Sequence, residues 1–212
     1  MNILDLPNEI ISHIFSLLNL KDLSKIINKH LFKLQKIHLI KKQTFKFNQI
    51  PNIYYNQIKK LKVGGCDDVD LTLFDNLIEL YISNNNLEKK DAQHISKLIN
   101  LQILNISYNH LGDEGAKHLS NLTNLKKLYI SNNNLRSQGA QHISNLSHLQ
   151  ILYISYNNIG NEGAQSISNL NHLQILNISY NYLGPQGVQH ISKLIHLIQL
   201  NISNNNLGDE GA

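Results

Sequence analysis

The 212-residue sequence contains one cysteine, one methionine, three prolines and no tryptophan. A single cysteine excludes a disulfide framework and a zinc finger built from several cysteines. Charged residues make up only 16% of the chain and hydrophobic residues 42%, which argues against a charge-driven disordered protein. No apolar run is long enough to span a membrane, and the opening MNILDLPNEI lacks the basic and apolar regions of a signal peptide. We therefore expect a soluble protein in a reducing compartment, the cytoplasm, with the nucleus as the alternative.

Charge is divided unevenly along the chain. Residues 1–62 carry 11 lysines against three acidic residues, a net charge of +8, whereas residues 63–212 carry eight basic and 12 acidic residues, a net charge of −4. Two segments of different character are therefore expected. Residues 21–62 contain no arginine, the residue that makes bidentate phosphate contacts. We interpret their scattered lysines as a solvated surface rather than a nucleic-acid or membrane-binding site.

The second segment is built from a 24-residue repeat that reads LxxLxIxxNxLxxxGAxxISxLxx. The stretch LQILNISYN occurs at residues 101–109 and again, unchanged, at residues 173–181. Five complete units cover residues 77–196, and a sixth, truncated unit runs from residue 197 to residue 212. Self-similarity at such a period is the signature of a solenoid, in which each repeat stacks on its neighbours. The units open at Leu77, Leu101, Leu125, Leu149, Leu173 and Leu197.

Each unit predicts a short strand followed by a short helix. In Leu128-Tyr129-Ile130 apolar and polar residues alternate with period two, which is typical of a strand with one buried face. Leu128 and Ile130 would point inward, and Tyr129 and Ser131 outward. The GDEGA stretch at residues 112–116 then turns into a helix, because acidic residues suit a helix start and its alanine is small enough to pack closely.

One asparagine follows each predicted strand. A buried amide at this position can hydrogen-bond to the main chain of neighbouring turns, and leaving such a group unpaired would cost roughly 1–3 kcal/mol. We therefore predict a structural ladder formed by Asn85, Asn109, Asn133, Asn157, Asn181 and Asn205.

These units resemble leucine-rich repeats over residues 77–212, and their 24-residue GDEGA form is similar to the GALA-type subclass. The resemblance implies an α/β solenoid with parallel strands on the concave face and short helices on the convex face. Residues 45–76 would form a linker and an irregular first repeat, in which Cys66 takes the asparagine position. No histidine–carboxylate pattern surrounds Cys66, so buried packing is favoured over a catalytic nucleophile.

The outward columns of the predicted strands would line the concave surface that such a solenoid uses for binding. Tyrosine, serine and asparagine dominate these columns, and they combine rigid amphipathic rings with small hydrogen-bonding groups. A target-binding surface is one interpretation, and columns that only record recent duplication are the other. The predicted target-binding residues are Tyr81, Tyr108, Tyr129, Tyr153, Tyr156 and Tyr180.

The N-terminal segment has a different pattern. In residues 5–34, DLPNEIISHIFSLLNLKDLSKIINKHLFKL, apolar residues recur at helical spacing, and Pro7 suits a first helical position. Three short helices in about 40 residues are too small for a secure core of their own. The segment therefore needs a partner surface, in this chain or in another.

The LPxE opening, the apolar residues after it and the DL pair at residues 22–23 resemble an F-box. The resemblance implies that residues 1–44 form a three-helix segment that docks onto the Skp adaptor subunit of a cullin–RING ubiquitin ligase. Where the family usually has a Val-Cys or Val-Ser pair and then a tryptophan, this chain has INKHLF at residues 27–32, which shortens the second half. The residues that would contact the adaptor are Leu6, Pro7, Ile10, Ile14, Phe15 and Leu18.

The two segments together predict a non-catalytic substrate receptor of a Skp–cullin–F-box ubiquitin ligase, with a protein target held on the concave face. The alternative is a stand-alone interaction scaffold whose N-terminal helices cap the solenoid. The chain has no phosphate-binding loop, acid dyad or nucleophile motif, so we expect no enzyme activity. We expect no cofactor and no metal, because histidine columns spread along a surface do not converge on one point. These columns are His94, His118, His142 and His190, and His148, His172 and His196.

Overall fold

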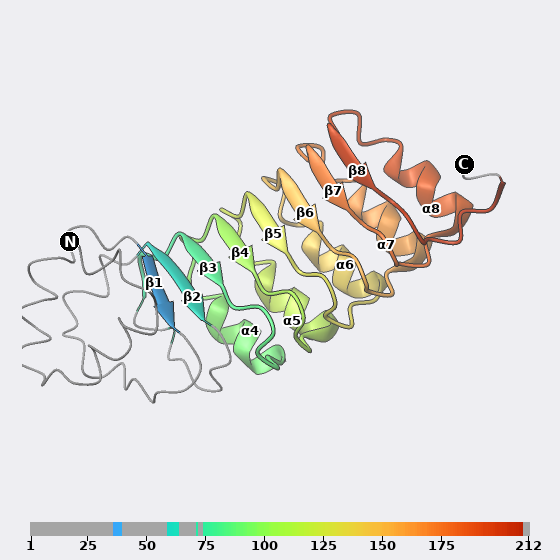
Figure 1. The fold of residues 1–212 in the computed structure, drawn as a ribbon. Helices are drawn as coiled ribbons and strands as arrows, with labels where there is room; N and C mark the ends of the chain where they lie inside the picture. The colour runs from blue at the N-terminus through green and yellow to red at the C-terminus, as the bar shows by residue number, and fades with distance from the viewer. Residues whose placement is uncertain (1–35, 40–58, 64–70, 72–73, 210–212) are drawn as a thin grey trace, which may run out of the picture.

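A computed structural model describes residues 36–39, 59–63, 71 and 74–209, which form a curved solenoid of one sheet and one layer of helices (Figure 1). The sheet has eight parallel strands that follow one another in chain order. Figure 1 shows the helices together on one side of the sheet and spread more widely than the strands. A helix is about 10 Å wide, whereas parallel strands lie about 4.8 Å apart, so the sheet takes the inner, concave side.

The strands are β1 (Lys36–Leu39), β2 (Lys60–Val63), β3 (Glu79–Tyr81), β4 (Ile103–Asn105), β5 (Lys127–Tyr129), β6 (Ile151–Tyr153), β7 (Ile175–Asn177) and β8 (Gln199–Asn201). The helices are α4 (Lys89–Ile95), α5 (Gly112–Leu119), α6 (Ser137–Ile143), α7 (Gly160–Ile167) and α8 (Gly184–Ile191). The predicted alternation of parallel strand and short helix is therefore confirmed for the repeats from β3 to β8.

The strand register follows the sequence repeat from β3 onward, where each residue pairs with the one 24 positions later, as Leu104 does with Leu128. One step is shorter, because Lys60 of β2 pairs with Glu79 of β3, 19 positions later. The repeat that joins β2 to β3 is therefore shorter than the 24-residue unit. Strand β1 lies within residues 1–44, where the sequence analysis expects only helices, and it joins the sheet by pairing with β2.

Leucine and isoleucine columns fill the space between sheet and helices. In β3 to β7 the central leucine is buried and its two neighbours are half-buried, as the alternating pattern predicts. Leu125, Leu128, Ile130 and Leu135 all have no exposed surface. In β8 all three residues are exposed, because no further described repeat covers that edge of the sheet.

The helices have seven or eight residues, fewer than an isolated helix needs for stability in water. Packing against the neighbouring repeats therefore holds them in place. At the start of α6, Oδ1 of Asp113 accepts hydrogen bonds from the main-chain N–H groups of Arg136 and Gly139, each at 2.8 Å. A carboxylate of one repeat thus caps the helix of the next, and a Cβ at Gly139 would collide with it.

The asparagine column joins successive repeats through their main chains. Nδ2 of Asn157 donates to the carbonyl of Ile154 in its own repeat at 3.0 Å and to that of Ile130 in the preceding repeat at 3.2 Å. Oδ1 of Asn157 accepts the N–H groups of Asn133 and Leu135, each at 3.0 Å. One buried side chain therefore satisfies main-chain groups on both sides of a repeat boundary.

The asparagines of the column are not equivalent. Three side-chain oxygens accept N–H groups from the preceding repeat, and these belong to Asn109, Asn157 and Asn205. Three others are buried without a hydrogen-bond partner among the described residues, and these belong to Asn85, Asn133 and Asn181. The two kinds alternate along the solenoid, so identical residues contribute differently to stability.

The predicted adaptor-contacting residues and Cys66 lie outside the described residues. The domain boundaries at residues 44 and 76 therefore stay predictions.

We expect Asn157→Ala to destabilise the protein by about 3 kcal/mol and Asn133→Ala by only about 1–2 kcal/mol, because the first change removes the acceptor of two main-chain N–H groups as well as the amide donors. Guanidinium unfolding followed by circular dichroism measures both. Asn158→Ala is the matched control, since Asn158 is exposed, and it should shift stability by less than about 0.5 kcal/mol. Equal losses for Asn157→Ala and Asn133→Ala would contradict the alternation.

Candidate functional site

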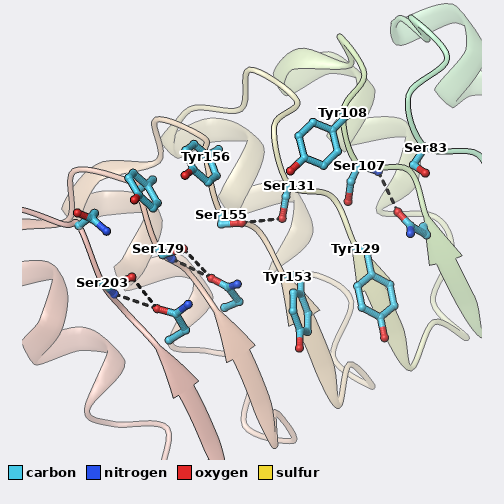
Figure 2. Close-up of a pocket in the computed structure, with 15 residues that line it drawn as sticks. Ser83, Ser107, Tyr108, Tyr129, Ser131, Tyr153, Ser155, Tyr156, Ser179 and Ser203 are labelled. Atoms are coloured by element: carbon cyan, nitrogen blue, oxygen red, sulfur yellow. Dashed lines mark hydrogen bonds between the residues drawn. The ribbon is translucent and has the colours of Figure 1, made fainter.

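The concave face carries an open groove of about 500 Å³ that crosses the strands from the repeat of Ser83 to the repeat of Ser203 (Figure 2). We call it the concave groove. Its lining consists only of tyrosine, serine and asparagine, so none of the described side chains that line it carries a charge. Backbone curvature and side-chain size shape it, because small residues alternate with large ones across the strands.

Tyrosines stand in two rows on opposite sides of the groove. In the strand row, Tyr129 and Tyr153 lie with ring centroids 5.0 Å apart and planes tilted by 37°. In the turn row, just after the strands, Tyr156 and Tyr180 stack with centroids 4.1 Å apart and planes at 11°. Tyr108 stands in the same turn row, two repeats before Tyr156 (Figure 2).

Serines lie between the two tyrosine rows and form the floor of the groove (Figure 2). The sequence analysis has the serine column pointing outward. In the structure Ser107, Ser131, Ser155 and Ser179 are only 4–8% exposed, because the larger side chains on both sides cover them. Oγ of Ser155 donates to Oγ of Ser131 at 2.9 Å, which links two repeats.

Asparagines complete the strand row and have a fixed orientation. Oδ1 of Asn177 accepts both the N–H and the Oγ–H of Ser179, at 3.2 and 2.8 Å. Asn201 bonds to Ser203 in the same way, and Oδ1 of Asn105 accepts a single N–H at 3.2 Å. Because an N–H must meet an acceptor, each oxygen faces its serine, and each amide N–H₂ group has no hydrogen-bond partner among the described residues.

The turn-row tyrosines have a left-handed backbone. Tyr108, Tyr156 and Tyr180 have φ of 58°, 53° and 56°. The same column holds Asn84 and Asn132 at φ of 59° and 53°, and asparagine tolerates this conformation better than tyrosine does. The tyrosines are also well exposed, at 40–56%. Each one therefore carries conformational strain without the benefit of burial.

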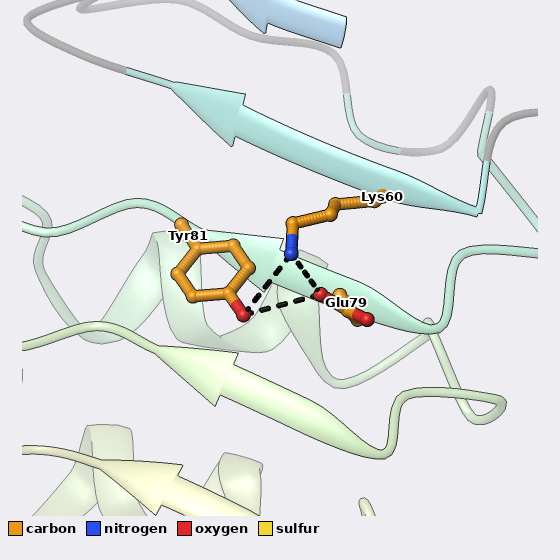
Figure 3. A network of polar contacts seen from close by, with 3 residues as sticks. All are labelled: Lys60, Glu79 and Tyr81. Carbon is orange, nitrogen blue, oxygen red and sulfur yellow. Dashed lines mark hydrogen bonds and ion pairs between the residues drawn. The ribbon is translucent and has the colours of Figure 1, made fainter. Parts of the chain in front are cut away.

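Five of the six predicted target-binding tyrosines line the concave groove, and these are Tyr108, Tyr129, Tyr153, Tyr156 and Tyr180. Tyr81 does not. Its hydroxyl donates to Oε2 of Glu79 at 3.1 Å, and Nζ of Lys60 lies 4.7 Å from its ring centroid (Figure 3). The hydrogen bond with Glu79 raises the pKa of Lys60 above its ordinary value, against an opposing effect of burial. The shortened β2–β3 step creates this cluster, so the repeat pattern alone does not reveal it.

Two phenols of the groove have raised pKa values. Burial raises the pKa of Tyr129 above its ordinary value, and the nearby phenols of Tyr153 and Tyr81 raise it further. A side-chain hydrogen bond with Tyr180 raises the pKa of Tyr156. Neither Tyr129 nor Tyr156 therefore ionises in the physiological pH range.

The serine floor and the asparagine amides are not among the target-binding residues predicted from the sequence, although both columns are visible in it. Of the histidine columns, His94 and His148 are exposed. Over residues 36–39, 59–63, 71 and 74–209, no group of three or more histidine, cysteine, aspartate or glutamate side chains is placed to hold a metal ion. No helix in that same part of the chain is long and apolar enough to cross a membrane.

The repeats match known protein families. A leucine-rich-repeat model matches residues 75–135 and again residues 123–183, which together are more than half of the chain, and a second leucine-rich-repeat model matches residues 193–212. The chain belongs to the leucine-rich-repeat family. Members of this family are typically non-catalytic modules for protein interaction. The matches begin at residue 75 and do not reach the F-box-like segment.

Solved structures share the fold. Internalin C2 (inlC2) from Listeria monocytogenes is 22% identical with a TM-score of 0.63, over 73% of this chain and 66% of that chain. An internalin (inlF) from the same species is 21% identical with a TM-score of 0.55, over 73% of this chain and 51% of that chain. This leucine-rich-repeat chain thus spans about half to two thirds of the internalin chains it matches. No curated protein sequence matches it.

We expect Tyr108→Asn to raise the free energy of unfolding by about 0.5–1 kcal/mol, because asparagine relieves the left-handed strain at this exposed position. Tyr129→Asn should instead lower it by about 1 kcal/mol, since Tyr129 sits on a strand and loses its ring contact with Tyr153. Both changes introduce a residue that an adjacent repeat carries in the same column, Asn132 beside Tyr108 and Asn105 beside Tyr129. Denaturant unfolding of the two variants tests the difference, and a loss of stability in Tyr108→Asn would show that the turn-row tyrosines are structural.

Proposed function

We propose that the protein is a non-catalytic receptor that binds a protein target in the concave groove. The groove itself is the observation that carries this proposal. Exposed tyrosine rings supply large contact area at low cost in side-chain entropy, and serine and asparagine beside them supply adaptable hydrogen bonds. Three tyrosines stay in a strained backbone conformation while they remain exposed, which is typical of residues kept for binding.

A second part of the proposal is that the N-terminal segment docks onto a ubiquitin ligase. The LPxE opening and the apolar spacing of residues 1–44 support docking on a Skp-type adaptor, which would make the chain a substrate receptor of a cullin–RING ubiquitin ligase with GALA-like repeats. Such a receptor would act in the cytoplasm or the nucleus.

In this proposal the chain itself makes and breaks no bond. It raises the effective concentration of the target's lysines near a ubiquitin-charged enzyme, as any tether between two binding events does. The solenoid holds the target, and the N-terminal segment holds the ligase. Because the repeats form a rigid stack, the solenoid would fix the direction in which the target is presented to the ligase.

A second candidate is a stand-alone interaction scaffold without a ubiquitin link. One observation favours it: β1, within residues 1–44, pairs with β2 and extends the sheet. At least part of the N-terminal segment therefore belongs to the solenoid, which fits a capping role.

Changing Leu6 and Pro7 together to Ala should abolish retention of a Skp-type adaptor while the repeats stay folded, because interface energy concentrates in a few central apolar residues. Co-purification of the full chain with the adaptor measures binding, and circular dichroism confirms folding.

Changing Tyr129 and Tyr153 together to Ala is the matched control. This variant should keep the adaptor and lose any target held in the concave groove. If the folded wild-type protein does not retain the adaptor, the ligase function is wrong and the scaffold takes its place. If Leu6/Pro7→Ala retains the adaptor as the wild type does, the docking residues assigned here are wrong.

A further inference from the structure

We propose that the concave groove binds a proline-rich segment in the polyproline II conformation, an inference that rests on the proposed receptor function and names its partner class. Three properties of the groove lead to this partner: its lack of charge, its excess of hydrogen-bond donors and its spacing.

The lack of charge argues against a phosphopeptide, an acidic segment or a basic segment as the partner. Only tyrosine, serine and asparagine line the groove among the described residues, so it offers no cation to a phosphopeptide or an acidic segment and no anion to a basic one. The charged cluster of Lys60 and Glu79 is closed on itself by an ion pair and lies outside the lining (Figure 3). Lys127 shares the outward face of β5 with Tyr129 but also lies outside the lining, so recognition within the groove uses ring contacts and neutral hydrogen bonds.

Hydrogen bonding in the strand row is one-sided. The side-chain oxygens of Asn105, Asn177 and Asn201 are engaged by serines of the same repeats, and their amide nitrogens have no partner among the described residues. The phenol groups of Tyr129 and Tyr153 add further donors on the same wall. A polyproline II segment complements this wall, because its carbonyl groups make no internal hydrogen bonds and proline has no N–H to satisfy.

The spacing of Tyr108 and Tyr156 in the turn row matches the same conformation, and Tyr180 stacks on Tyr156 with centroids 4.1 Å apart, so that these two rings form one aromatic surface. Tyr108 and Tyr156 are two repeats apart, which is about 9.6 Å at the usual strand spacing. A polyproline II helix has three residues per turn and presents the same face every 9.3 Å or so. An extended strand repeats its face every 6.7 Å or so and does not match. Aromatic-lined grooves with such spacing bind every third residue of a proline-rich chain.

The length of the groove also sets the length of the peptide that it can hold. It crosses the strands from β3 to β8, which is five strand spacings or about 24 Å. At a rise of 3.1 Å per residue, that distance accommodates about eight residues in the polyproline II conformation. A shorter peptide should therefore bind more weakly.

Fluorescence polarisation of the full chain with a labelled peptide, Pro-Pro-Ala-Pro-Pro-Ala-Pro-Pro, tests the inference. Two peptides of equal length are controls: a flexible Gly/Ser peptide and an alternating Thr/Val peptide that favours an extended strand. We expect the proline-rich peptide to bind at least about tenfold more tightly than either control. Because no charge lines the groove, raising the salt from about 0.05 to 0.5 M should leave its affinity nearly unchanged.

The protein variants use residues that the repeats themselves carry. Tyr108→Asn combined with Tyr156→Asn should weaken the peptide by about tenfold or more, since both ring faces are removed without backbone strain. Tyr182→Asn is the matched control: Tyr182 is also left-handed, with φ of 58°, and 67% exposed, but it does not line the groove. The Tyr182→Asn variant should bind the proline-rich peptide as tightly as the wild type does.

Equal binding of the three peptides, unchanged binding by the Tyr108/Tyr156 double variant, or a strong dependence on salt would each overturn the inference. These failures are distinct from failure of the receptor function. If the protein binds no proline-rich peptide but a protein target is still lost with Tyr129/Tyr153→Ala, the partner class is wrong and the receptor stands. None of these measurements tests the proposed docking of the adaptor through Leu6 and Pro7, which the Leu6/Pro7→Ala variant tests separately.

Discussion

The buried amide after each strand is the interaction on which the rest of the structure depends. A strand of three residues forms few ladder hydrogen bonds, and the chain then turns sharply through left-handed residues such as Asn132 and Tyr156. Such a turn leaves main-chain carbonyl and N–H groups inside the molecule. Asn157 satisfies groups of its own repeat and of the preceding one, so the turns of neighbouring repeats must stack in register. A repeat without this amide would leave the main-chain groups of its turn without these hydrogen-bond partners.

When the repeats stack in register, equivalent side chains of successive repeats line up on the concave face. Because equivalent residues of successive repeats lie one strand spacing apart, every outward column becomes a continuous row on the concave face. The serine column can form a floor only because tyrosines and asparagines stand on both sides of it. A change in one repeat therefore alters one step of a row on the concave face rather than a separate pocket.

The turn row holds two residue types that differ in how well they suit its backbone conformation. Asparagine at Asn84 and Asn132 suits the left-handed turn, whereas tyrosine at Tyr108, Tyr156 and Tyr180 strains it and leaves a ring exposed to water. The stacked contact between Tyr156 and Tyr180 offsets part of the cost and fixes the orientation of both rings before a ligand arrives.

The sequence by itself determined the period, the order of strand and helix, and the buried and outward columns, because burial of one strand face imposes a local alternation that can be read directly. It also placed five of the six candidate tyrosines in one groove, since a strict 24-residue spacing admits only one register. Tertiary structure alone decided the remaining features. The 19-residue step from β2 to β3 pairs Lys60 with Glu79, and Tyr81 contacts both of them and does not line the groove. The serines became a floor because neighbouring rows cover them. The ladder oxygens alternate between bonded and unbonded states, although their residues are identical, because each state depends on the backbone of the adjacent repeat.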